Sequence, residues 1–558
     1  MSQQNARSKG WYETVRDYTQ RLVGIRSVSP GNGEIQVAHE ILRLLHTDGL
    51  DTCYTASGLD PVEGDAYGRQ NVYAFLQGQT PTALVLLGHF DTVDTADYGV
   101  LEPWALDPEG LATRLDILSQ SSPGADINSQ EDASEWMFGR GVADMKSGVA
   151  VNIALLRRLA QEERSPLSIV LLATPDEENE SAGVLQGIRF LLRLREQYGL
   201  RYIGAINTDY TTAIYPGDPR RYIYTGTVGK LLPSFLCIGC ESHAGDPFQG
   251  LDANLLAAAL IRDLSMNDEL CDRIPGQITA PPVTLHATDL KDHYDVQLPF
   301  AAYFYLNVLT STTDPTIMLG RLQARAEKVL AQLLQHIDTT EQRWLQASGE
   351  QGWQERLQTR SGAVLTYADL YSETVKKRGE EQVTRALVAE WEHWSTTLDK
   401  RERSLHLVQR LWNLSGRQGP AIIISYAPPY YPHVGAKSGA LQKAIETVVN
   451  AHPEHDIVIR EYFPLLSDMS YLRLEAGLDL TALKANMPLW RDPGTAFLPG
   501  AYNLPLKEIA QLDLPIVNWG PYGRGAHQRH ESVLMSYSFE TLPQLLYETI
   551  KQLATISK

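Results

Sequence analysis

Four acidic residues follow one apolar segment within five positions. The stretch LLATPDEENES, residues 171–181, begins as a buried strand should and then carries Asp176, Glu177, Glu178 and Glu180. Two carboxylates held about 4 Å apart repel by roughly 4 kcal/mol at an effective dielectric constant near 20, so a half-buried cluster needs a positive partner. Water, basic side chains or metal ions can supply it. Taken alone, the segment is more simply explained as a solvated acidic turn.

Polar side chains also follow other apolar segments of the chain. His89 and Asp91 come directly after ALVLLG, Asp209 follows YIGAIN, and His527 lies in a glycine-rich loop after LPIVNWG. Asp144 stands in GRGVADMKSG, just before a predicted helix. Ligand sites of open α/β sheets form at the carboxyl ends of the strands, so we expect these loops to converge. Imidazoles together with carboxylates are ligands that Zn²⁺, Mn²⁺ or Co²⁺ prefers, and two such cations would balance the acidic cluster.

The spacing of His89 and Asp91 suggests a role for the second residue of the pair. Alternate residues of an extended segment point the same way, so Asp91 can accept the other ring N–H of His89 and fix its tautomer. The alternative is a histidine at the end of a strand that is satisfied by its neighbour. The pair by itself is a weak signal for a metal ligand, and the polar residues of the other loops make the stronger case.

Apolar strands and amphipathic helices alternate through the first part of the chain. Short apolar runs recur near residues 83, 167, 202 and 514, and in GVAVNIALLRRLAQEE an apolar stripe joins Val149, Ile153, Leu156 and Ala160. This alternation predicts an α/β fold with a mostly parallel sheet flanked by helices. After about residue 223 the pattern changes to paired strands with helices, which predicts an inserted α+β unit.

We therefore predict a catalytic domain that is interrupted by an insert. Its first part spans 1–222, an inserted lid domain spans 223–439, and the second part of the catalytic domain spans 440–558. The section 340–415 is heavily charged and helical, and we interpret it as a solvated helical hairpin that extends the lid. The sequence leaves the purpose of this section open.

Composition narrows the class of protein. A chain of 558 residues is long enough for two or three domains. Its 49 Lys and Arg residues against 67 Asp and Glu residues give a net charge of −18, which argues against nucleic acid and anionic membrane surfaces as general partners. The first residues lack the apolar core of a secretory signal, and no apolar run approaches the length of a membrane span. We expect a cytoplasmic enzyme.

Six segments together resemble a known family. LLGHFDTVD, GRGVADMKSG, TPDEENESAG, NTDY, ESHAG and GPYGRGAHQRHE stand in the order seen in the co-catalytic zinc aminoacylase and carboxypeptidase family. That family includes acetylornithine deacetylase, succinyl-diaminopimelate desuccinylase, aminoacylase-1 and the glutamate carboxypeptidases. The length and the long insert look most like its arginine-utilisation branch, the RocB-type proteins. The resemblance implies a hydrolase of an amide or peptide bond next to a free carboxylate, acting on a small amino-acid or peptide substrate.

The resemblance also implies a ligand set for two divalent ions, with Zn²⁺ expected and Co²⁺ or Mn²⁺ as alternatives. Asp144 would bridge the two ions, and the peptide bond that follows it would be cis. His527 is preferred over His530 because its offset from Glu531 matches the family motif. The implied metal ligands are His89, Asp144, Glu178, Asp209 and His527.

Three further residues receive roles from the same resemblance. Glu177 matches the general base, Asp91 matches the acid that orients His89, and His243 of ESHAG matches the lid histidine that contacts the substrate carbonyl. From its residues alone, His243 is equally well explained as a histidine that caps a turn. Many relatives form dimers through the lid, so a homodimer is expected.

A catalytically silent family member that binds an amino acid or a peptide is the alternative function. The presence of Glu177 beside Glu178 favours the enzyme, because a protein that only binds metal needs the ligand and not the base.

Overall fold

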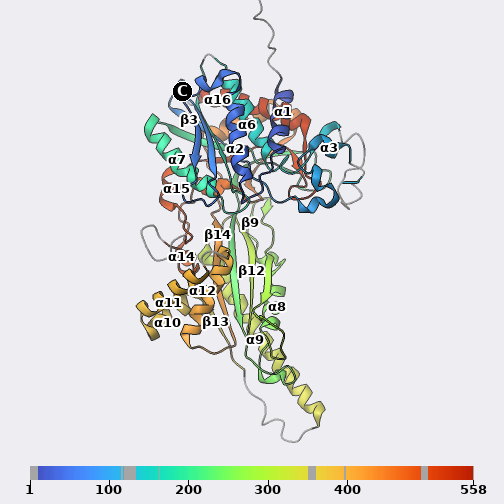
Figure 1. The fold of residues 1–558 in the computed structure, drawn as a ribbon, viewed down its shortest axis with the longest axis vertical. Coiled ribbons are helices and arrows are strands. Elements are labelled where there is room, and N and C mark those ends of the chain that lie inside the picture. The colour runs from blue at the N-terminus through green and yellow to red at the C-terminus, as the bar shows by residue number, and fades with distance from the viewer. Residues whose placement is uncertain are drawn as a thin grey trace, which may run out of the picture. The chain divides into compact units, whose positions relative to one another are not determined.

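The computed structural model describes residues 10–114, 117–118, 134–162, 164–349, 360–394, 398–491 and 501–556. The chain divides into two compact units (Figure 1). Unit 1 comprises Met1–Thr227, Val434–Leu474 and Pro505–Lys558, and unit 2 comprises Val228–His433 and Glu475–Leu504. The boundaries predicted from the sequence were 222 and 439. No pattern in the sequence predicts that the segment 475–504 groups with unit 2.

Unit 1 is built around an eight-stranded sheet with the order β1-β2-β5-β3-β6-β16-β7-β15. Four of its seven strand pairings are parallel, and the four consecutive neighbours β5, β3, β6 and β16 all run in the same direction. The predicted mostly parallel sheet is thus confirmed. The strands are β1 Ala56–Pro61, β2 Gln70–Leu76, β3 Thr82–His89, β5 Ser168–Thr174, β6 Arg201–Asn207, β7 Arg221–Thr227, β15 Ile457–Phe463 and β16 Ile516–Asn518.

Helices cover both faces of this sheet (Figure 1). One layer contains α6, and the other contains α7 and α15. The sequence predicted a single apolar stripe on α6, but 14 of its 15 residues are buried because α1 and α16 cover the side that faces away from the sheet. The helices are α1 Trp11–Val23, α2 Gly33–His46, α6 Lys146–Ala160, α7 Ala182–Tyr198, α13 Ala440–Ala451, α15 Leu506–Leu512 and α16 Leu542–Ile556.

Unit 2 contains a five-stranded sheet with the order β11-β12-β8-β14-β13. The sequence predicted paired strands after about residue 223, but β7 belongs to the sheet of unit 1 and β8 to the sheet of unit 2, so the two do not pair. Helices α8 and α9 pack against each other, and α8 also contacts β8 and β12. The elements are β8 Gly229–Ile238, β11 Val283–Asp289, β12 Ala301–Thr310, β13 Ala363–Thr366, β14 Ala421–Tyr431, α8 Ala253–Leu264 and α9 Pro315–Ser348.

The charged helical section differs from the predicted hairpin. Its described part holds three helices, α10 Tyr367–Arg378, α11 Glu380–Trp394 and α12 Lys400–Ser415, after α9 ends. Apolar residues of each helix are buried, and α12 packs on β14, so the section has a small core of its own. Residues 350–359 and 395–397 lie outside the described residues. Among the helices of the described ranges, none is both long and apolar enough to cross a membrane.

Candidate metal centre

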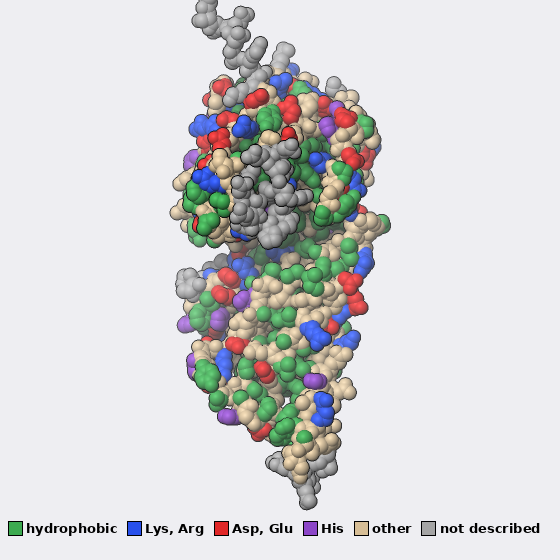
Figure 2. All heavy atoms as spheres, turned by 90° about the vertical axis from the view of Figure 1, so that its right-hand side faces the viewer, with side chains coloured by type: hydrophobic (Ala, Val, Ile, Leu, Met, Phe, Trp, Pro, Cys, Tyr) green, Lys and Arg blue, Asp and Glu red, His purple; other side chains and the backbone are tan. Residues whose placement is uncertain are grey.

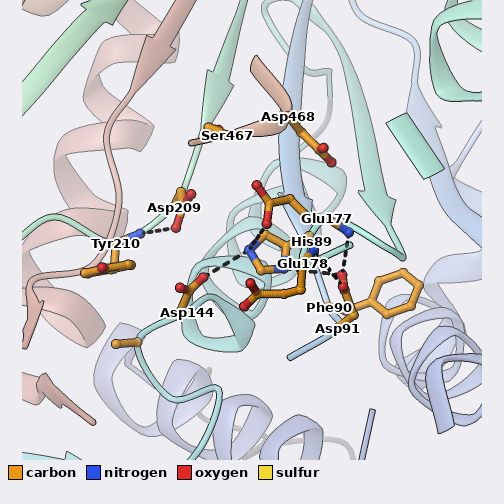
Figure 3. Close-up of polar contacts among 12 residues, drawn as sticks. His89, Phe90, Asp91, Asp144, Glu177, Glu178, Asp209, Tyr210, Ser467 and Asp468 are labelled. Carbon is orange, nitrogen blue, oxygen red and sulfur yellow. Dashed lines mark hydrogen bonds and ion pairs between the residues drawn. The ribbon is translucent and has the colours of Figure 1, made fainter. Parts of the chain in front are cut away.

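Four neighbouring strands deliver polar side chains to one edge of the sheet in unit 1. β3 ends at His89, β5 ends shortly before Glu177 and Glu178, β6 ends two residues before Asp209, and the loop after β16 carries His527. Because these strands are parallel neighbours, their carboxyl ends lie at the same edge. Figure 3 shows the side chains of His89, Asp144, Glu177, Glu178 and Asp209 gathered there.

The structure forms two groups of possible metal donors that share one carboxylate. His89, Asp144 and Asp209 make one group, and Asp144, Glu178 and His527 make the other, with the donor atoms of each group within 4.8 Å of one another. His89 Nε2 lies 3.1 Å from Asp144 Oδ1, and His527 Nε2 lies 3.2 Å from Asp144 Oδ2. His527 Nε2 also lies 3.0 Å from Glu178 Oε1. Asp144 therefore stands between two sets of ligands, as a bridging carboxylate would.

Asp91 joins the histidine to the acidic turn. Its Oδ1 accepts a hydrogen bond of 3.1 Å from the backbone N–H of Glu177, and its Oδ2 accepts one of 3.1 Å from the backbone N–H of Glu178. His89 Nδ1 lies 3.4 Å from Asp91 Oδ1. One fully buried carboxylate thereby sets the position of His89 and of both glutamates.

The loop that carries Asp144 is fixed by another buried acid. Glu531 Oε1 accepts hydrogen bonds from the backbone N–H groups of Ala143 (3.0 Å) and Asp144 (3.1 Å), while its Oε2 accepts one of 2.9 Å from Arg140. The Asp144–Met145 peptide bond is cis, as the resemblance implied. At the next residue, Lys146 Nζ donates a hydrogen bond of 2.7 Å to the carbonyl of Ile25.

A buried ion cluster holds the acidic turn at its first residue. Asp176 adopts a left-handed φ of 72°, a conformation that aspartate tolerates better than most residues. Its backbone N–H donates to Glu34 Oε1 at 2.9 Å, and its carboxylate binds the guanidinium of Arg69. Arg69 also contacts Asp65 Oδ1 at 2.6 Å and Glu34 Oε2 at 3.4 Å. Arg69 thus provides the positive partner that an acidic cluster requires, but it pairs with Asp176 and not with Glu177 or Glu178.

The remaining acids of the centre are short of positive charge. Burial raises the pKa of Glu177 well above its ordinary value, and the charges of Asp468, Glu178 and Asp209 raise it further against the effect of His89. Burial and the charge of Asp144 likewise raise the pKa values of Glu178 and Asp209. The hydrogen bonds of His527 with Asp144 and Glu178 raise the pKa of that imidazole to about 11. Burial and neighbouring carboxylates thus disfavour the charged forms of Glu177, Glu178 and Asp209.

These residues fit a pair of divalent metal ions. Tetrahedral ligands about 2.0–2.1 Å from an ion lie roughly 3.3 Å from one another, and the measured separations of 3.0–3.2 Å between His89, Asp144, Glu178 and His527 are close to this value. The donor set of imidazoles and carboxylates without thiolate suits Zn²⁺, Mn²⁺ or Co²⁺. Two cations would also supply the positive charge that the raised pKa values show to be lacking.

Asp468 is a site residue that the sequence analysis missed. It lies on a short 3₁₀ turn after β15, is 3% exposed, and accepts a hydrogen bond of 3.1 Å from Thr174 Oγ1 at the end of β5 (Figure 3). The preceding residue, Ser467, accepts a hydrogen bond of 3.0 Å from the side chain of Asn207 at the end of β6. The only available signal was an isolated Ser-Asp pair in a loop, which does not follow an apolar run directly.

The two remaining histidines of the sequence prediction lie in different surroundings. The ring of His530 lies against Gly525, where a Cβ atom would come within 2.5 Å of it, and His530 belongs to neither donor group. His243 lies in unit 2 on an exposed turn, where its Nδ1 accepts a hydrogen bond of 3.0 Å from the backbone N–H of Gly245. Its assignment as a substrate contact stays a prediction, as do the roles given to the other site residues.

A mostly parallel α/β domain with two overlapping donor sets at its strand ends has the architecture of a dinuclear metalloenzyme. Residues 85–483 match the model of Peptidase family M20/M25/M40, and the chain belongs to this family. It is therefore a metal-dependent peptidase or amidohydrolase. The resemblance found in the sequence is confirmed.

Two relatives from Bacillus subtilis match the chain over almost its whole length. The uncharacterized protein YqjN is 31% identical over 545 residues, which cover 95% of each chain. Protein RocB is 31% identical over 562 residues, which cover 96% of this chain and 94% of RocB. A succinyl-diaminopimelate desuccinylase of Methylibium petroleiphilum is 28% identical over 237 residues, which cover 42% of this chain and 52% of the desuccinylase.

Solved structures share the fold of the chain at low identity. Aminopeptidase PepT from Bacillus cereus has a TM-score of 0.51 and 12% identity, covering 97% of this chain and 99% of PepT. The dipeptidase Dug1p from Saccharomyces cerevisiae has a TM-score of 0.50 and 10% identity, covering 98% of each chain. These two likenesses support the fold and nothing finer.

Proposed function

We propose that the chain is a two-zinc hydrolase that cleaves an amide or peptide bond next to a free carboxylate, as an N-acyl amino acid deacylase or a dipeptidase does. The observation that carries the proposal is the position of Glu177. It lies at the edge of the two donor groups, with its Oε2 3.9 Å from His89 Nε2, and belongs to neither. A ligand and a separate base thus stand side by side at positions 178 and 177.

Each chain residue then has a definite task. When bound, two zinc ions would act as Lewis acids that polarise the scissile carbonyl and make water more acidic. Glu177 accepts the proton of the attacking water and returns it to the departing amine. Asp91 keeps this carboxylate in place through the backbone N–H of Glu177. His243 of unit 2 is proposed to stabilise the negative charge that develops on the carbonyl oxygen.

Exchange of the base separates this enzyme from a silent binding protein. Glu177→Gln should lower kcat by about 10²- to 10⁴-fold and bind as much zinc as the wild type, because Glu177 lies outside both donor groups. Glu180→Gln is the matched control, since it removes an acid from the same turn and also lies outside these groups. Equal turnover in the Glu177→Gln variant and the wild type would contradict the assignment. No turnover by the wild type across N-acyl amino acids and dipeptides would favour the silent alternative.

The substrate is proposed from the relatives. Similarity to RocB over the whole chain supports a place in arginine metabolism, as the sequence resemblance implied, and we propose that this occurs in the cytoplasm. A screen should compare N-acetyl, N-succinyl and dipeptide substrates that carry arginine or ornithine with the same series carrying leucine. Preference for the basic series, measured as kcat/KM, is the expected result.

We further propose that the protein forms a homodimer through unit 2. Strand β11 lies at the edge of the five-stranded sheet, and Val283 and Leu285 on it are 44% and 56% exposed. Figure 2 shows hydrophobic side chains spread over the visible face of this unit. An exposed apolar edge strand is an established pairing surface. Light scattering should give the mass of two chains for the wild type and of one for Leu285→Lys.

A further inference from the structure

A second cluster of imidazoles and a carboxylate lies on the surface of unit 1. The segment His452-Pro453-Glu454-His455 follows the end of α13, and Pro453–His455 forms a 3₁₀ turn. The side chains of His452, Glu454 and His455 are 28%, 60% and 29% exposed. The cluster shares no residue with the two donor groups around Asp144, and the proposed hydrolysis does not use it.

The turn brings both histidines to one side. His452 directly precedes the turn and His455 ends it, and their rings stack at 5.9 Å between centroids with an interplanar angle of 25°. Glu454 stands between them in the sequence, and its carboxylate turns back toward the two rings. Three metal-binding side chains thus come from four consecutive residues.

The separations within the cluster match those around a small divalent ion. Glu454 Oε1 lies 3.1 Å from His452 Nδ1 and 3.7 Å from His455 Nε2, and a set of donor atoms from the three residues lies within 4.8 Å of one another. Donor atoms placed tetrahedrally about 2.0–2.1 Å from Zn²⁺ are roughly 3.3 Å apart. The two measured values lie on either side of this distance, so small side-chain adjustments suffice to close the site.

A second acid orients the first histidine from the neighbouring helix. His452 Nε2 lies 2.8 Å from Glu548 Oε2 on α16, and the amide of Gln544 donates a hydrogen bond of 2.7 Å to Glu548 Oε1. A proton on Nε2 directed at Glu548 leaves the lone pair of Nδ1 pointing at Glu454. Metal-binding histidines commonly have such a carboxylate on the other ring nitrogen, where it fixes the tautomer and makes the ligand more basic.

We propose that His452, Glu454 and His455 form a third metal site, which binds a borderline divalent ion such as Zn²⁺, Ni²⁺ or Cu²⁺. Two imidazoles and one carboxylate suit these ions better than Ca²⁺ or Mg²⁺, which prefer oxygen ligands. Three protein ligands leave at least one coordination position for water. The partial exposure of the ligands gives the ion a route from solvent, and the contact with Glu548 links the site to α16.

Zinc stoichiometry tests the proposal. Untagged full-length protein is stripped of metal, dialysed to equilibrium against buffered micromolar free Zn²⁺, and analysed for zinc per chain by mass spectrometry. We expect the wild type to bind one equivalent more than His455→Ala, with hydrolytic activity unchanged in the variant. His336→Ala is the matched control because His336 is an exposed histidine on α9 outside any such group, and it should bind as much zinc as the wild type.

A further variant checks the orienting acid. Glu548→Gln should keep the total stoichiometry at saturating zinc and weaken one class of site by about 10- to 100-fold. Equal zinc content in the wild type and His455→Ala would overturn the third site, and equal losses in His455→Ala and His336→Ala would show adventitious binding to surface histidines. Glu178→Ala separates this result from the proposed function, since it should reduce the zinc of the Asp144 centre and leave the difference due to His455 in place.

Discussion

Arg69 is the cation that allows three carboxylates to remain buried beneath the acidic turn. Its side chain is 5% exposed and contacts Glu34, Asp65 and Asp176, whose side chains are 0%, 5% and 1% exposed. With all three acids ionised the cluster carries a formal charge of −2, and Arg69→Met, which keeps most of the side-chain volume, makes it −3. The substitution therefore leaves uncompensated charge in the interior of unit 1.

The expected cost is large compared with that of a surface ion pair. Removal of one partner from a buried pair typically costs about 3–5 kcal/mol. At about 2 °C per kcal/mol for a domain of this size, Arg69→Met should lower the Tm by roughly 6–10 °C. The matched control is Arg26→Met, whose ion pair with Asp94 has side chains 50% and 58% exposed and should contribute about 0–1 kcal/mol.

Calorimetry at two pH values distinguishes lost charge pairing from lost packing. Burial already raises the pKa of Glu34 to about 8 and that of Asp176 above its ordinary value, while Arg69 opposes both shifts. Loss of the guanidinium raises these pKa values further, so the native state of the variant binds more protons than that of the wild type. Lower pH then stabilises the variant relative to the wild type, and the Tm deficit should be smaller at pH 5.5 than at pH 8. An equal deficit at both pH values, or the same deficit in Arg26→Met, would refute the electrostatic explanation.

Two further predictions concern the metal centre. Zinc binding to the stripped protein at pH 7.5 should release at least two protons per chain, measured by titration calorimetry in buffers of different ionisation enthalpy. Hydrogen bonds raise the pKa of His89 well above its ordinary value against the effect of burial, and they raise the pKa of His527 to about 11, while the ligands Glu178 and Asp209 also have raised pKa values. Binding without proton release would contradict this. Asp468→Asn should shift the acidic limb of the kcat/KM profile to lower pH, because the negative charge of Asp468 raises the pKa of Glu177. An unchanged limb, or one moved to higher pH, would show that Asp468 does not raise the pKa of Glu177.

The main features of the centre could be predicted because each residue has a local signal. His89, Glu178 and Asp209 follow apolar strands closely, and parallel strands that are neighbours must present their carboxyl ends together. Asp144 precedes a helix within a distinctive motif. The separation of His527 from His530 rested on the offset from Glu531, and the structure shows its physical basis, since Glu531 holds the backbone of Asp144 while His530 lies over Gly525.

Other features had no local signal. Asp468 lies in an irregular loop, and only the packing of that loop against the ends of β5 and β6 brings it to the centre. Arg69 stands 107 positions before Asp176, and no pattern in either segment indicates that the two residues form an ion pair. The grouping of residues 475–504 with unit 2 depends on contacts between distant segments, which no periodicity of the chain encodes.

The sequence by itself determined the fold class, the family and the set of side chains that converge, because strand periodicity and motif order are local properties. The tertiary structure alone decided which acids receive a cation from the protein and which do not. Arg69 pairs with Asp176 and opposes the rise that burial imposes on its pKa. In contrast, neighbouring carboxylates add to the effect of burial and raise the pKa values of Glu177, Glu178 and Asp209. That difference arises from distance and burial, since the Coulomb energy of a carboxylate depends on the charges that surround it in space.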